Sequence, residues 1–338
     1  MFAFIVLVTL GLTGGHMATT NHDTGKASEV KLGVTIILDV QYMPLSRKSA
    51  HLTRYLTTFL RAVELRFSDM IDPKISLVLT DILEMTPAQE ADIYGMYNII
   101  KNTIYGIWTR DYLRETKNPF PENEGIKLIM TGFDLWSADE RVGGNITNSA
   151  DKNGACTKSN VALCEDDGLT FSGVGSAAKA IAQLLGAEYD FNNKNQTCRQ
   201  YHGYLLDNYT GISDHYNLSV CGKEYIKKRI EDSSPQRKAC LSGGSNNNKA
   251  KMEVPESSEL PFDFFEKTNP CNLKHGAPPC KPRRDGNGCK VECCLKKGVK
   301  ESVNKHDGTP CGKEKSNICS NGECILDPRK KRQADKKI

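Results

Sequence analysis

The sequence predicts an α/β protein in which helices pack on a mixed, mostly parallel sheet, followed by a small disulfide-rich module. Short segments rich in β-branched residues alternate with longer amphipathic ones through the first half of the chain, which is the pattern of strands alternating with helices. Eight of the 13 cysteines then fall between Cys271 and Cys324, where large apolar side chains are few. Disulfides are therefore expected to replace a conventional core in that second part.

Four segments are expected to be strands because they are short and rich in apolar or β-branched residues. They are Lys31–Val40, Ile75–Leu83, Ile126–Thr131 and Asn160–Cys164. A helix is expected over Ala50–Met70, with leucine and phenylalanine on one face and charged residues on the other. One or two further helices are expected over Pro87–Tyr112, with these side chains inward: Ile93, Met96, Ile100, Ile104 and Trp108. This alternation favours a mostly parallel or mixed sheet.

Residues 1–18 have the features of a secretory signal peptide. The apolar run Phe2–Leu12 is too short to span a bilayer, and small residues follow it. A buried N-terminal strand is the alternative interpretation. Because no later stretch is long and apolar enough for a transmembrane helix, the sequence predicts a soluble, secreted protein. Four N-x-S/T sites favour the same route and are candidate glycosylation sites: Asn145, Asn195, Asn208 and Asn217.

The chain carries a formal net charge of +4, and an excess of that size lies in its C-terminal tail, residues 326–338. This tail is interpreted as a solvated end; contact with an anionic surface and processing at Arg329–Arg332 are the alternatives. No nucleic-acid partner is expected. Residues 241–260 are rich in glycine, serine, asparagine and charge, which is typical of a linker.

The stretch Phe171–Asp190 organises the rest of the chain. Apolar residues recur in it at i, i+3, i+4, i+7 and i+8, which predicts an amphipathic helix that ends at Gly186. Lys179 and Gln183 lie four residues apart on the opposite face, which is expected to look outward into a cleft.

This stretch resembles the active-site helix of reprolysin-type (adamalysin) metalloproteases, whose motif is A-H-E-x-x-H-N-L-G-A-x-H-D. The resemblance places Lys179 at the first zinc ligand, Gln183 at the second and Tyr189 at the third. It places Ala180 at the general base and Leu206 at the methionine turn beneath the zinc. The resemblance therefore implies a zincin-like fold over residues 30–240.

The residues at these positions do not suit the chemistry of the family. A lysine is a cation at neutral pH, and an amide or a neutral phenol is a poor zinc ligand. A methyl group cannot act as a general base. We therefore expect no catalytic residue, no bound metal and no cofactor. The ammonium of Lys179 is expected near the former metal position, stabilised by a carboxylate such as Glu188 or Asp190.

Two alternatives keep some chemistry in the chain. His202 and His215 follow the helix and could form a new two-histidine site, and zinc is expected only if such non-standard ligands hold it. Lys179 could act as a catalytic lysine, although a lysine on a polar helix face is more often solvated or ion-paired.

The cysteines extend the resemblance. It implies disulfides between Cys156 and Cys240 and between Cys198 and Cys221, with Cys164 left over. The module expected over residues 261–325 ends with the segments Asp307–Gly312 (DGTPCG) and Cys319–Cys324 (CSNGEC). This ending resembles the cysteine-rich domain that follows the catalytic domain in ADAMTS-type and tick salivary reprolysins. Zinc binding is the alternative use of three cysteines in that module: Cys289, Cys293 and Cys294.

We thus expect a secreted, catalytically inactive metalloprotease homologue that acts by binding an extracellular protein. The resemblance implies a saliva or venom component whose partner is a host matrix protein or haemostatic factor. The alternative is an active zinc metalloendopeptidase with non-standard ligands. The sequence predicts no oligomeric state.

Overall fold

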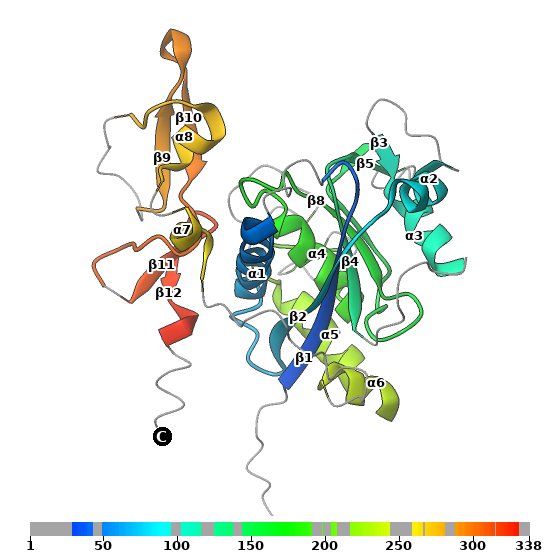
Figure 1. Cartoon of the computed structure of the whole chain (residues 1–338). Helices are drawn as coiled ribbons and strands as arrows, with labels where there is room; N and C mark the ends of the chain where they lie inside the picture. Colours follow the sequence, from blue (N-terminus) through cyan, green and yellow to red (C-terminus); the bar gives the residue numbers. More distant parts are fainter. Residues whose placement is uncertain are drawn as a thin grey trace, which may run out of the picture.

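The computed structural model describes residues 29–42, 49–95, 103–115, 125–137, 144–190, 198, 204–207, 217–243, 259–265, 268–280, 288–314 and 316–330. At its centre is a five-stranded sheet in the order β2-β1-β4-β8-β7 (Figure 1). The strands are β1 (Glu29–Leu38), β2 (Lys74–Glu84), β4 (Ile126–Thr131), β7 (Asn148–Ala150) and β8 (Val161–Glu165). All neighbours run parallel except β7, which is antiparallel to β8. The sheet is therefore mixed and mostly parallel, which confirms the predicted fold class.

Helices cover both faces of this sheet. They are α1 (Ser49–Leu65), α2 (Pro87–Gly95), α3 (Gly106–Glu115) and α4 (Val174–Leu185). Because side chains alternate along a strand, Ile36 of β1 joins the core shared with α1 and α4. Its neighbour Ile37 joins a second core, shared with α2 and α3. Each such fully buried side chain contributes about 1.5–3 kcal/mol, so the sheet is stabilised from both sides.

The segment Pro87–Tyr112 differs from the prediction, because a strand separates its two helices. β3 (Thr103–Tyr105) forms a small sheet with β5 (Asp134–Ser137) and β6 (Gly144–Ile146). Ile104 is buried as expected, but in this strand rather than in a helix. The threonine–isoleucine–tyrosine sequence suits a strand. Ile93 is also buried, whereas Met96 and Ile100 lie outside the described residues.

Two helices after the central region were not predicted, α5 (Val220–Glu231) and α6 (Pro235–Leu241). Each begins with a serine whose hydroxyl accepts a hydrogen bond from a backbone amide of the first turn. Ser219 accepts from Gly222 at 2.9 Å, and Ser234 accepts from Arg237 at 3.3 Å. These capping serines are the sequence signals that could have revealed both helices.

The C-terminal module consists of short elements held by disulfides. They are α7 (Pro261–Phe264), α8 (Pro270–His275), β9 (Lys290–Cys294), a 3₁₀ turn (Lys296–Gly298), β10 (Lys300–Asn304), β11 (Asn317–Ser320) and β12 (Glu323–Leu326). The four disulfides are Cys271–Cys293, Cys280–Cys294, Cys289–Cys319 and Cys311–Cys324. The three cysteines considered as zinc ligands are therefore all oxidised and offer no thiolate to a metal. The same holds for the close sulfur group of Cys289, Cys311 and Cys324.

The structure joins Cys156 to Cys240 and Cys198 to Cys221, the pairs that the resemblance implies. Cys164 is the remaining thiol and is completely buried in the core between the sheet, α1 and α4. Burial raises the pKa of this thiol well above its ordinary value. Because the thiolate is the reactive form, Cys164 is expected to be inert in the folded protein.

The module packs against α1 (Figure 1). Phe171, just before α4, stacks on Tyr55 of α1 with ring centroids 4.2 Å apart. Phe264 and Phe265 of the module meet Phe171 edge-on at 5.2 and 5.4 Å. Such geometry is favourable beyond simple apolar burial, so this aromatic cluster joins the module to α1 and to the segment just before α4.

Several predictions concern residues outside the described part of the chain. They include the signal peptide, most of the linker, residues 331–338 of the tail, and four side chains: Asn195, Asn208, His202 and His215. Of the other two glycosylation sites, Asn145 lies on β6 and Asn217 is exposed. Among the described residues, no helix has the length and apolar character needed to cross a membrane.

Candidate functional site

The helix α4 is anchored at its N-terminus by a buried carboxylate. Asp166 accepts hydrogen bonds from the amides of Gly173 at 2.7 Å and Gly168 at 2.9 Å. The hydroxyls of Tyr42 and Tyr55 also donate to it, each at 2.9 Å. Burial raises its pKa, and these hydrogen bonds oppose that shift. The carboxylate therefore ties the start of α4 to α1 and to Tyr42, in the turn that follows β1.

The helix ends at Gly186, as predicted. This residue has φ 109°, a left-handed conformation that favours glycine, and its amide bonds back to the carbonyl of Gln183 at 2.9 Å. A Cβ at this position would lie 2.6 Å from Cγ of Arg229. The turn thus requires glycine for two reasons.

Lys179 extends from α4 toward Tyr189, Asp190 and Asp207, and these four residues form the Lys179 region. Its Nζ donates to the backbone carbonyl of Asp207 at 3.1 Å and lies 5.4 Å from the centre of the Tyr189 ring. Burial lowers the pKa of Lys179 from 10.5 to about 8, although the charges of Asp207 and Asp190 act in the opposite direction. At pH 7 the side chain is consequently still a cation, held by a carbonyl, an aromatic face and nearby negative charge.

Asp190 and Asp207 are both buried in this region, with 2% and 1% of their surfaces exposed. Oδ1 of Asp190 accepts from the Ser219 hydroxyl at 2.5 Å, and its Oδ2 has no hydrogen-bond partner among the described residues. Burial raises the pKa of Asp190 to about 6; Asp207 adds to the shift, and the Ser219 bond and the Lys179 charge oppose it. Asp190 therefore acts on Lys179 through charge, in line with the expectation, whereas Glu188 pairs with Lys152 instead.

Gln183 does not share this region, which corrects the prediction that its face looks outward. The side chain is buried, and its Oε1 accepts a hydrogen bond from Nδ2 of Asn148 at 2.9 Å. Asn148 lies on β7, the edge strand that the sequence pattern did not reveal. Because β7 covers this side of α4, Gln183 has become part of the contact between helix and sheet.

The other positions singled out by the resemblance are apolar and buried. Ala180 is completely buried in the core. Leu206 is 1% exposed, and its carbonyl accepts from the amide of Asp190 at 3.2 Å. Ala180 thus serves the packing of the core, and Leu206 supports the turn that carries Asp190.

The donor set does not fit zinc. The three ligand positions offer an ammonium, an amide already bonded to Asn148 and a phenol, of which the first is a cation and the others are weak ligands. The structure brings Lys179 and Tyr189 together and pairs Gln183 with Asn148 instead. Sequence reasoning missed Asn148, Asp207 and Ser219, because no motif marks a residue that serves only to hold another side chain in place.

No family model matches the sequence, and no curated protein sequence matches it either. Metalloproteinase-II from Bacteroides fragilis is similar in structure, with a TM-score of 0.39 and 14% identity, over 61% of this chain and 55% of that chain. An archaemetzincin from Methanopyrus kandleri has a TM-score of 0.35 and 12% identity, over 60% of this chain and 96% of its own. A chain in the structure of a chaperone–substrate complex has a TM-score of 0.40 and 9% identity, over 64% of this chain and 36% of its own. The chain thus spans about half the length of the Bacteroides protein and is similar to metalloproteinases in part of its own length.

Proposed function

We propose that this protein is a secreted, reprolysin-like protein that has lost zinc and peptidase activity and acts by binding another extracellular protein. The observation that carries the proposal is the position of Lys179. Its ammonium donates to the Asp207 carbonyl beside the Tyr189 ring. A protein cation thus stands at a position where the family would use a histidine to hold a metal cation.

The energetics agree with this proposal. Placing Zn²⁺ beside the half-buried ammonium of Lys179 would add like-charge repulsion. Gln183 could turn toward a metal only by giving up its bond to Asn148, which would leave a buried amide unsatisfied at a cost of about 1–3 kcal/mol. The methyl group of Ala180 supplies no general base, a loss of about 10²–10⁴ in rate by itself.

Binding, by contrast, requires only a preserved surface on a stable scaffold. The buried core around α4, the Gly186 turn and six disulfides hold that scaffold. The disulfides and sequons support secretion. The resemblance to salivary reprolysins supports a host matrix protein or haemostatic factor as the partner, with the protein acting as a saliva or venom component.

The first test is digestion of casein and gelatin by the purified protein, with and without EDTA, beside an active zinc endopeptidase as positive control. We expect no EDTA-sensitive cleavage. Cleavage that EDTA abolishes would instead support the alternative, an active metalloendopeptidase with non-standard ligands.

The second test addresses binding. Surface plasmon resonance against immobilised collagen, fibronectin and fibrinogen should give saturable binding to at least one of them. Absence of binding to all three, with folding verified by circular dichroism, would contradict this class of partner.

A further inference from the structure

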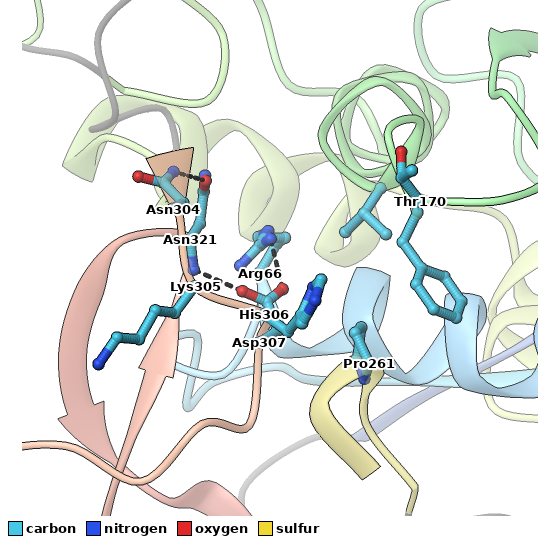
Figure 2. Close-up of a pocket in the computed structure, with 10 residues that line it drawn as sticks. Arg66, Thr170, Pro261, Asn304, Lys305, His306, Asp307 and Asn321 are labelled. Carbon is cyan, nitrogen blue, oxygen red and sulfur yellow. Dashed lines mark hydrogen bonds and ion pairs between the residues drawn. The ribbon is translucent and has the colours of Figure 1, made fainter. Parts of the chain in front are cut away.

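A cavity of about 150 Å³ lies where the C-terminal module meets α1 and the loop before α4. Figure 2 shows Arg66, His306 and Asp307 on one side of it and Thr170 on the other. This cavity is distinct from the Lys179 region, so the following inference does not depend on the proposed loss of zinc.

A buried ion pair fixes one wall of the cavity. Nη2 of Arg66 lies 2.6 Å from Oδ2 of Asp307, and Nη1 donates to Oγ of Ser320 at 2.7 Å. The backbone amide of Asn321 donates to Oδ1 of Asp307 at 2.5 Å. The two charges cancel, and the additional bonds satisfy the carboxylate. This wall therefore presents fixed polar groups without a net charge.

His306 supplies a polar atom that lacks a partner. Its Nε2 is buried and makes no hydrogen bond within the described part of the chain. The ring lies against Phe265 with centroids 4.5 Å apart, and a backbone hydrogen bond to Thr268 involves the ring. Since Nε2 is without a partner, we assign that bond to Nδ1–H, which donates to the Thr268 carbonyl. Nε2 of the neutral ring then carries a lone pair that can accept from a ligand.

The cavity lining also includes three apolar residues, Phe171, Val174 and Pro261. A ligand must therefore combine a hydrogen-bond donor with an apolar face. Because the charges of Arg66 and Asp307 cancel, this wall favours neither a cationic nor an anionic ligand. The ammonium of Lys305 extends away from His306 and Thr170 (Figure 2), so no uncompensated cation calls for an anionic ligand.

We propose that this cavity binds a neutral sugar unit, with a hydroxyl donating to Nε2 of His306 and a C–H face packed on Phe171 and Val174. A pyranose ring offers hydroxyls at its rim and C–H groups on its faces, which matches both the polar and the apolar residues of the lining. The sugar can come from a free saccharide or from a glycan on a partner protein, because both present the same ring.

The test is saturation-transfer difference NMR on the intact protein, after enzymatic removal of its own N-glycans. The ligands are the methyl glycosides of glucose, galactose, mannose and N-acetylglucosamine, with methyl glucuronide and p-cresol as comparators. We expect transfer to at least one neutral glycoside. Transfer to none of them, or only to p-cresol or the glucuronide, would overturn the proposal. Titration with a glycopeptide carrying the best sugar then distinguishes a glycan from a free saccharide.

Variants locate the binding. His306→Phe keeps a ring against Phe265 but removes the lone pair, so binding should weaken about tenfold, the effect of one lost hydrogen bond. His275→Phe is the matched control, since His275 belongs to the same module but not to the cavity lining. Equal binding by wild type and His306→Phe would also overturn the proposal.

A second variant keeps the test decisive if His306→Phe does not fold. Asn321 lines the cavity and has φ 49°, a conformation that glycine adopts readily. Asn321→Gly therefore removes a polar side chain of the lining while keeping the turn. We expect weaker sugar binding with unchanged near-ultraviolet circular dichroism; unchanged sugar binding would count against the assignment of this cavity.

Discussion

The buried charge of Lys179 should make stability depend on pH in an unusual direction. Its pKa is lowered from 10.5 to about 8 in the folded protein. Between these values the unfolded chain binds the proton and the folded one does not, so the free energy of unfolding rises as pH rises. This lowering of the Lys179 pKa corresponds to a difference of about 3 kcal/mol in the free energy of unfolding. About 2 kcal/mol of this difference in the free energy of unfolding develops between pH 7 and pH 9.5.

The perturbation is Lys179→Met, and the assay is urea unfolding across that pH range. Other groups titrate in both proteins, so the quantity to compare is the difference between the two curves. As pH rises from 7 to 9.5, the free energy of unfolding of wild type should increase by about 2 kcal/mol relative to that of Lys179→Met. Lys152→Met is the matched control, because Lys152 is 47% exposed and should give a curve parallel to wild type. Parallel curves for Lys179→Met would refute a buried Lys179 cation.

Three further predictions concern the junction and the helix end. Burial lowers the pKa of His306 below 6.5, so stability should fall as pH drops through 6.5 toward the folded-state pKa, and acid titration of His306→Phe should show a smaller loss. Arg66→Met leaves the buried Asp307 carboxylate without its cation and should lower the free energy of unfolding in urea by about 3–5 kcal/mol. The double variant Arg66→Met/Asp307→Asn should recover part of that stability, and no recovery would argue against an ion-pair origin. Gly186→Ala should lower Tm by several degrees, since it combines a positive φ with a Cβ 2.6 Å from Arg229, and an unchanged Tm would contradict the turn geometry.

The fold class could be predicted from the sequence because the patterns that mark its strands and helices are local. The strand Ile126–Thr131 is buried at every position and has the predicted bounds. Gly186 ends α4 because only the left-handed conformation fits there. Both features depend on a few neighbouring residues, so their patterns could be recognised without knowing the rest of the fold.

The candidate site was less accessible to sequence reasoning because its contacts are long-range. Gln183 was expected to face a cleft, but the three-residue strand β7 brings Asn148 to it. Lys179 was expected near a carboxylate of its own segment, yet its hydrogen bond goes to the carbonyl of Asp207, 28 residues away. A periodic pattern identifies a polar face of a helix but not the segment that covers it.

Zinc content tests the central claim most directly. The full-length protein would be incubated with excess zinc at neutral pH, dialysed, and measured by inductively coupled plasma mass spectrometry beside an active zinc endopeptidase. If Lys179 has replaced the metal, the protein will retain far less than one zinc per chain. Retention of one zinc per chain, lost on treatment with EDTA, would contradict the account.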